Sequence, residues 1–297
     1  SLNHDKNRKL IGDDEHVYFK NCIINMKNLE NLNSHKRDSR ITFNEEEHSY
    51  TIDDKNKAIS VTQLIQKFFP KFDKNYWAER ESNKTGESKE EILNRWEELG
   101  GKARDLGTEL HNQIENYYNG TEYNNSREFE KFINFHEKYI SKNYNPFRTE
   151  WRVFDENKLL AGSIDMVYQK SDNEVFLFDW KRSKNLVKTM DGRHEFGHAG
   201  PFTSDEDIDY TKYSVQLHTY RYILETFYSL RIPKDNLYMV VFHPKNQGYV
   251  MFRAKDVSDK IPWLIEHYDW CVEQSAASKA MEADYKAWAT GAGAGEV

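Results

Sequence analysis

Polar and apolar residues follow strand spacing in some parts of this chain and helical spacing in others. Residues 1–38 are polar and rich in asparagine, which predicts a loosely attached N-terminal arm. Two short alternating stretches joined by a polar turn follow, and they predict a β-hairpin over residues 41–52. A short helix is predicted next, capped by Ser60 or Thr62 and ended at Pro70.

Beyond this start, the pattern predicts a group of helices, then consecutive strands, then a mixture of both. Apolar residues at helical spacing predict helices at 74–82, 88–99, 102–118 and 126–141. Strands are predicted at 147–154, 159–169 and 174–181, followed by a helix at 211–230, strands at 236–243 and 248–254, and a helix at 261–275. This order is typical of an α/β fold with a central mixed β-sheet flanked by helices. We expect one folded domain over 39–276 with an insertion near 185–210, and a C-terminal helix and flexible tail over 277–297.

Composition excludes several classes of protein. The chain is 38% hydrophobic, which is enough for a core, so it is not wholly disordered. Its 42 basic and 49 acidic residues give a net charge of -7, which argues against a protein that coats nucleic acid by bulk charge. The two cysteines, Cys22 and Cys271, exclude a disulfide framework and a cysteine-held iron–sulfur cluster. Because no apolar run is long enough to span a membrane and the first residues lack a signal-peptide pattern, we expect an intracellular protein without a membrane partner.

The predicted strand 174–181 is apolar and ends in a carboxylate and an amine. Asp179 and Lys181 project to the same face because side chains alternate along a strand, and Trp180 projects to the other. Burying an aspartate and a lysine is costly unless they pair with each other or bind an ion. A structural ion pair and a catalytic site are both open at this point.

The preceding strand adds a second carboxylate. Asp165 lies inside an otherwise apolar stretch, one short turn before the strand that carries Asp179. Hairpin pairing would place the two carboxylates on adjacent strands, where their repulsion favours a divalent cation between them. Gly162 removes a side chain at a point where the backbone of a substrate could approach.

Two of the predicted helices carry weaker signals. His111 and Glu115 are four residues apart and therefore share one face of their helix. Gln216 and Tyr220 have the same spacing on the helix at 211–230. Taken alone, each pair is better explained by an ordinary helix surface than by a site.

The order of these four motifs is more specific than any one of them. A His-xxx-Glu helix, a Gly-xx-Asp strand, an Asp-x-Lys strand and a Gln-xxx-Tyr helix resemble the PD-(D/E)XK nuclease superfamily, specifically its RecB-like exonuclease branch. That branch includes mitochondrial genome maintenance exonucleases, CRISPR-associated RecB-like nucleases and viral exonucleases. The resemblance covers about residues 40–255 and implies a restriction-endonuclease-like core. The chain departs from it by lacking the four cysteines of iron–sulfur members and by a long insertion, the 34 residues between Lys181 and Gln216.

The resemblance also implies a metal centre. His111, Asp165 and Asp179 would be side-chain ligands of Mg²⁺ or Mn²⁺, and the backbone carbonyl of Trp180 would be another. Carboxylate and carbonyl oxygens suit such hard cations, and one imidazole favours Mn²⁺. No iron–sulfur cluster is expected.

The remaining matches would complete the catalytic and substrate-binding sets. Lys181 would orient the attacking water and offset the developing negative charge, beside the catalytic carboxylates Asp179 and Asp165. Glu115 would orient the histidine or hold a water. Gln216 and Tyr220 would position the scissile phosphate or a nearby nucleotide.

Basic residues follow the Asp-x-Lys motif closely, at positions 181, 182, 184, 188 and 193. We expect Arg182 and Lys184 to contact the phosphates of a DNA strand. A solvated charge run is the alternative explanation for them.

Together these features predict a divalent-metal-dependent DNA nuclease, an exonuclease that acts on single-stranded or end-frayed DNA. Two alternatives stay open: an endonuclease on the same fold, and a nucleic-acid-binding module without catalytic activity. A zinc hydrolase is disfavoured because no second histidine or cysteine has the spacing of a ligand pair.

Overall fold

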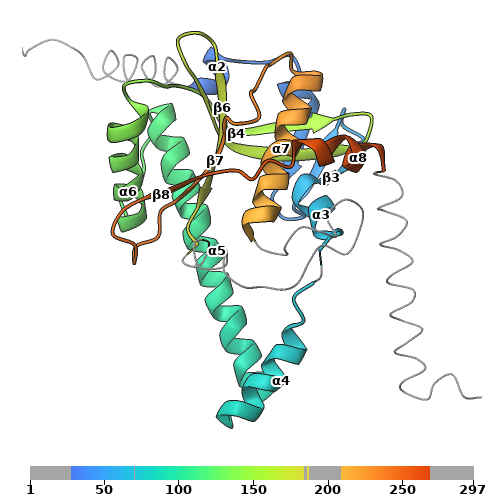
Figure 1. Ribbon diagram of the computed structural model, residues 1–297, viewed down its shortest axis with the longest axis vertical. Helices are drawn as coiled ribbons and strands as arrows, with labels where there is room; N and C mark the ends of the chain where they lie inside the picture. Colours follow the sequence, from blue (N-terminus) through green and yellow to red (C-terminus); the bar gives the residue numbers. More distant parts are fainter. Residues whose placement is uncertain (1–27, 70, 184–185, 187–208, 268–297) are drawn as a thin grey trace, which may run out of the picture.

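The fold is built on a mixed β-sheet with helices on both faces (Figure 1). The computed structural model describes residues 28–69, 71–183, 186 and 209–267, and these residues contain an eight-stranded sheet. The predicted α/β fold with a central mixed sheet flanked by helices is thereby confirmed. The arm up to residue 27, most of the insertion and the tail lie outside the described residues.

The strands and helices occur close to their predicted places. The strands are β1 (Ile41–Asn44), β2 (Ser49–Ile52), β3 (Asn56–Ser60), β4 (Asn145–Asp155), β5 (Leu160–Gln169), β6 (Val175–Lys181), β7 (Leu237–Val241) and β8 (Val250–Arg253). The helices are α2 (Leu29–Leu32), α3 (Val61–Gln66), α4 (Lys74–Thr85), α5 (Lys89–Asn119), α6 (Arg127–Phe135), α7 (Asp209–Phe227) and α8 (Ile261–Glu266). Shorter turns are η1 (Asp38–Arg40), the π-helical η2 (His136–Ile140) and η4 (Ser258–Lys260). Strand β3 was not predicted, because its first residues were assigned to a turn.

Helix α5 differs most from the predicted elements. The helices predicted at 88–99 and 102–118 form one continuous helix, so the predicted break at Gly100 and Gly101 is wrong. Glycine costs about 1 kcal/mol inside a helix, but it does not end one by itself. The helix ends at Gly120, whose φ of 70° is left-handed. Its N-terminal half projects beyond the sheet beside α4 (Figure 1), yet within the described chain no helix has the length and apolar character of a membrane span.

Strand β5 is the centre of the sheet and has three partners. β4 pairs with it along most of its length, from Asn145 opposite Gln169 to Asp155 opposite Leu160. β3 and β6 pair with different parts of β5: β3 with residues 160–161 and β6 with residues 166–169. Residues 162–165 therefore lie between the ends of β3 and β6, and we call this stretch the β5 gap.

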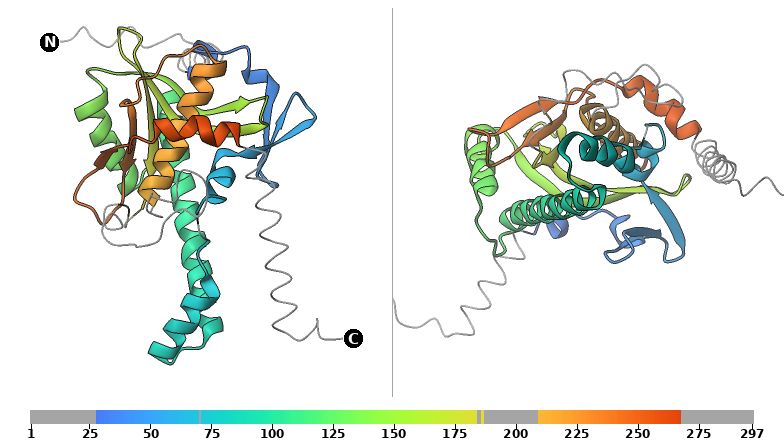
Figure 2. Two further views of the ribbon diagram at one scale, coloured as in Figure 1. Left: turned by 45° about the vertical axis from the view of Figure 1, so that its right-hand side comes forward. Right: turned by 90° about the horizontal axis from the view of Figure 1, so that it is seen from below.

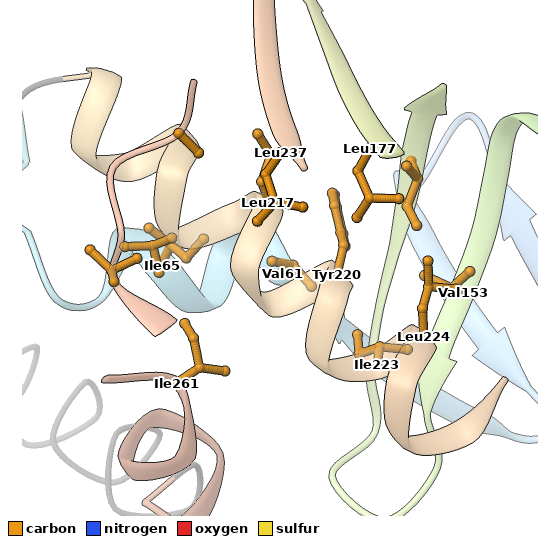
Figure 3. Close-up of a cluster of buried hydrophobic side chains, with 14 of the residues drawn as sticks. Val61, Ile65, Val153, Leu177, Leu217, Tyr220, Ile223, Leu224, Leu237 and Ile261 are labelled. Carbon is orange, nitrogen blue, oxygen red and sulfur yellow. The ribbon is translucent and has the colours of Figure 1, made fainter. Parts of the chain in front are cut away.

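The helices cover the two faces of the sheet with separate apolar cores (Figure 2). One core lies under α3, α7 and α8 and includes Leu177 of β6, Leu217 and Leu224 (Figure 3). The other lies under α5, α6 and η2 and includes Phe178 and Trp180 of β6. Since neighbouring residues of β6 belong to opposite cores, the alternation predicted for this strand is confirmed.

Candidate active site

The predicted site residues meet at the β5 gap. α5 contributes His111, β5 contributes Asp165, and the end of β6 contributes Asp179, Trp180 and Lys181. The elements converge because β6 pairs with β5 only from residue 166 onward, so Asp165 inside β5 and the polar end of β6 both lie next to His111 of α5. The structure thus brings together five of the residues that the sequence selected.

His111 is held by two acceptors. Its Nε2 lies 3.1 Å from the backbone oxygen of Trp180, and its Nδ1 lies 3.2 Å from Oε1 of Glu150. Because a carbonyl and a carboxylate only accept, both ring nitrogens must donate, and the imidazole is then positively charged. Burial opposes this charge, but Asp165, 3.5 Å from Nδ1, and Glu150 raise the pKa of His111 to about 10.

Asp165 is a largely buried carboxylate with a raised pKa. Its Oδ2 accepts a 2.8 Å hydrogen bond from the backbone N–H of Trp180. Burial raises the pKa of Asp165, and although His111 opposes this, the charges of Asp179 and Glu150 raise it further. This carboxylate therefore needs a proton or a cation to be stable where it lies.

Asp179 and Lys181 form the ion pair of the Asp-x-Lys motif. Nζ of Lys181 lies 2.9 Å from Oδ2 of Asp179, but this buried oxygen receives no well-directed hydrogen bond. The ammonium also lies 3.8 Å from the centre of the Tyr213 ring on α7. Burial alone would lower the pKa of Lys181, but the charge of Asp179 raises it above its ordinary value. The lysine is therefore a fixed cation at the gap.

Glu150 belongs to this site although the sequence did not reveal it. Besides His111, its carboxylate accepts a 3.3 Å hydrogen bond from Ser163. Among the described residues, His111, Glu150 and Asp165 form a group whose ligand atoms all lie within 4.8 Å of one another. Glu150 has a φ of 43°, a left-handed conformation that is strained for glutamate, and such strain recurs at functional sites. The only feature of the sequence that could have indicated a role for Glu150 is its position among apolar and basic residues in the predicted strand 147–154.

The strand opposite Glu150 is irregular as well. Ile164 packs in the core under α7, whereas Met166 packs in the core under α6. A regular strand would place both on one face, so the side-chain alternation reverses at Asp165. No sequence pattern predicts this reversal, and it directs the carboxylate toward His111 and Trp180.

Glu115 has a different place from the one predicted. It lines a cavity of about 790 Å³ that also includes His111 and Glu150, but the carboxylate that orients the histidine is Glu150. The prediction that Glu115 orients His111 is corrected accordingly, and the alternative, that Glu115 holds a water, stays a prediction. Burial raises the pKa of Glu115, and the charge of Glu150 adds to this effect.

Gln216 and Tyr220 form a hydrogen-bonded pair on α7. Nε2 of Gln216 donates to the Tyr220 hydroxyl at 2.9 Å and approaches the Thr62 hydroxyl at 3.3 Å. Tyr220 is buried, and its ring lies against Gly162, where an added Cβ would be 2.5 Å from Cε1. Space at Gly162 is thus used by a side chain of this protein, and the expectation that a substrate backbone approaches there is wrong.

The predicted phosphate contacts are only partly described. Nε of Arg182 donates to Oε1 of Glu128 at 2.6 Å, and both side chains are largely buried. Arg182 is therefore engaged within the protein by α6. Lys184 lies outside the described residues.

The donor set fits a hard divalent cation. It combines carboxylates, one imidazole and the carbonyl of Trp180, the donors that Mg²⁺ and Mn²⁺ accept. The raised pKa of Asp165 indicates that the protein groups around it leave its negative charge poorly compensated. A cation could be held by His111, Glu150 and Asp165, with the Trp180 carbonyl beside them.

Comparison with known proteins adds little to this picture. No family model matches the chain, and no curated protein matches it. Solved structures include 14 similar chains. One, described as "Crystal structure of SSO0001", has a TM-score of 0.28 and 12% sequence identity, and the match covers 85% of this chain and 86% of that chain.

Proposed function

We propose that this protein is a divalent-metal-dependent DNA nuclease that hydrolyses phosphodiester bonds at single-stranded or frayed ends. The observation that carries the proposal is the convergence of His111, Glu150 and Asp165 beside the Asp179–Lys181 pair. A cluster of carboxylates that the fold leaves undercompensated, with one fixed ammonium beside it, matches the needs of phosphodiester hydrolysis. The motif order that resembles RecB-like exonucleases supports the same function.

Phosphodiester hydrolysis requires that a water oxygen attack phosphorus, that the phosphoryl charge be offset, and that the leaving oxygen be protonated. When bound, Mg²⁺ or Mn²⁺ would supply Lewis acidity and lower the pKa of a water. Lys181 would donate hydrogen bonds to the attacking water or a phosphoryl oxygen, because its raised pKa keeps it charged. Asp179 would hold that ammonium in place.

The histidine and its carboxylate partner have complementary parts in this proposal. His111 would lose the proton on Nε2 and offer that nitrogen as a ligand. Glu150, bonded to Nδ1, would fix the tautomer and the ring plane. Gln216, anchored by Tyr220, would position the strand that carries the scissile phosphate.

A digestion assay with end-labelled single- and double-stranded DNA tests this function. The protein should degrade DNA with Mn²⁺ or Mg²⁺ and not with EDTA. Lys181→Met and Asp165→Asn should each abolish degradation while circular dichroism shows a folded protein. Full activity in both variants would show that these residues do not form the active site.

A matched control distinguishes a specific effect of Lys181 on the reaction from the general effect of replacing one lysine with methionine. Lys234 pairs with Asp256 on the surface at 2.7 Å, with both side chains about half exposed, so Lys234→Met should keep full activity. A circular single-stranded substrate distinguishes the two nuclease alternatives: an exonuclease leaves it intact, whereas an endonuclease cuts it. If nucleic acid binds but no substrate is cut with either cation, the inactive binding module is the better interpretation.

A further inference from the structure

A cationic notch lies at the other end of strand β6 from Lys181. It is a cavity of about 470 Å³ between the turn after η2 and the turn that joins β5 to β6. Lys138, Lys142 and Lys170 line it, and the only carboxylate in its lining is that of Asp172. The notch therefore has an excess of positive charge in a chain whose net charge is -7.

The charge of these lysines is not neutralised within the described part of the protein. No described carboxylate lies within 4.0 Å of the Lys138, Lys142 or Lys170 ammonium group, in contrast to Lys181 and Lys234. Asp172, whose Oδ1 accepts a 3.1 Å hydrogen bond from the Glu174 backbone N–H, offsets only part of this charge, since the lining has three lysines and one carboxylate. The three ammonium groups give the notch a net positive charge, which favours the entry of an anion.

Aromatic rings lie beside Lys170 in this notch. The Lys170 ammonium lies 5.2 Å from the centre of the Tyr144 ring and 4.9 Å from that of Phe176. Tyr144 is stacked on Tyr139 with ring centres 5.5 Å apart, and their hydroxyls are 3.3 Å apart. Burial raises the pKa of Tyr144, so its hydroxyl stays neutral and can donate. Lys170 is thus held by rings that do not cancel its charge.

The turn that carries the other two lysines is also unusual. Lys138 lies on the π-helical turn His136–Ile140, a rare geometry that occurs frequently at functional sites. The backbone N–H of Tyr144 donates to the Ile140 carbonyl at 2.9 Å and closes the following turn. The Ser141 hydroxyl, which donates to the Glu137 carbonyl at 3.0 Å, lies in the lining as well.

We propose that this notch binds the phosphate groups of a nucleotide-sized ligand. Three ammonium groups supply the charge that a phosphate requires, and the Ser171 hydroxyl and the asparagine amides of the lining supply neutral donors. The cavity volume lies within the range of small-molecule sites, about 300–1,000 Å³, and exceeds what a phosphate alone needs. The phosphates belong either to a free nucleotide or to a nucleic-acid strand, and in both cases binding here is separate from hydrolysis at the β5 gap.

Titration calorimetry in EDTA tests the notch without any contribution from a metal centre. The probes are pyrophosphate, ADP and an oligonucleotide without terminal phosphates. We expect pyrophosphate to bind, and Lys138→Glu/Lys142→Glu to weaken it about tenfold or more. Binding of ADP identifies a free nucleotide as the source of the phosphates, whereas binding of the oligonucleotide alone identifies a nucleic-acid backbone.

The control variant Lys36→Glu/Lys55→Glu makes the same change in net charge on exposed residues elsewhere. Its affinity for the probes should equal that of the unmodified protein. The proposal is overturned if no probe binds the unmodified protein, or if the control loses as much affinity as the notch variant. Because no outcome depends on DNA cleavage, an absence of nuclease activity would leave the notch hypothesis intact.

Discussion

Two largely buried aspartates near strand β4 have opposite surroundings. Asp38 accepts hydrogen bonds from Arg148 at 2.7 Å, from the Trp151 indole at 2.9 Å and from the His35 backbone at 2.7 Å. Burial would raise the pKa of Asp38, but these donors lower it below its ordinary value. Asp165 instead faces Asp179 and Glu150, and its pKa is raised.

The difference separates a structural ion pair from a candidate functional one. The donors around Asp38 satisfy its charge, so the group stabilises the native state by itself. Around Asp165, burial and the charges of Asp179 and Glu150 outweigh His111, which costs stability unless a proton or cation is bound. Burial by itself would raise the pKa of both aspartates. The direction of the net pKa shift, down for Asp38 and up for Asp165, distinguishes the two.

The largest expected effect is on activity. Asp165→Asn should reduce the rate of DNA degradation by about 10²–10³-fold or more, because it removes a ligand of the proposed metal centre. Its free energy of unfolding in EDTA should stay the same or rise, since the amide relieves repulsion with Asp179 and Glu150. Digestion rates and urea unfolding of the same preparation measure both quantities. A large loss of stability would show that Asp165, like Asp38, has a structural role.

Replacing Asp38 should lower the stability of the protein and leave the rate of DNA degradation unchanged. Asp38→Asn leaves Arg148, whose side chain is 5% exposed, without its charged partner, and should cost about 3 kcal/mol of unfolding free energy. The lowered pKa of Asp38 means that its contribution is present above its unfolded pKa and is lost as the pH falls through the folded one. Urea unfolding at neutral and acidic pH measures this, with the exposed Asp53→Asn, which should change little, as control. Equal stability of Asp38→Asn and the parent would contradict the comparison.

The contact between β5 and α7 gives a smaller effect. Gly162→Ala places a Cβ against the buried Tyr220 ring and should cost about 1–3 kcal/mol of unfolding free energy. In a Tyr220→Leu background the same change should cost clearly less, since the opposing ring is gone. Thermal unfolding of the two single variants and the double variant completes this cycle. If the losses of unfolding free energy in the two single variants add up to that of the double variant, the Tyr220 ring is not the reason that a larger side chain is unfavourable at position 162.

The smallest expected effect is the pH dependence of cation binding. With a pKa of about 10, His111 is protonated at neutral pH, so a cation must displace a proton. Apparent Mn²⁺ affinity, measured by thermal shift, should therefore rise by about tenfold per pH unit. Glu150→Gln removes a charge that raises this pKa, and should flatten the slope. An affinity independent of pH would exclude His111 as a ligand.

Much of the site was predictable because its members lie in recognisable local patterns. Asp179 and Lys181 end an apolar strand, and Asp165 interrupts another, so burial of charge could be read from either segment. The role of Glu150 could not, because it depends on a left-handed backbone conformation in a strand that pairs with β5. The prediction that Glu115 orients His111 was wrong for a related reason: the path of β4 brings Glu150 within 3.2 Å of Nδ1 of His111, and the sequence does not show this path.

By itself, the sequence determined the α/β class, most of the elements, and the position of Asp165, Asp179 and Lys181 on two otherwise apolar strands. These follow from periodicity and capping, which act over a few neighbouring residues. The tertiary structure alone decided that α5 is continuous, that Tyr220 occupies the space over Gly162, and that Glu150 joins the cluster at the β5 gap. Such outcomes depend on contacts between residues distant in sequence, because the sum of many packing and charge interactions determines which side chains share a buried space.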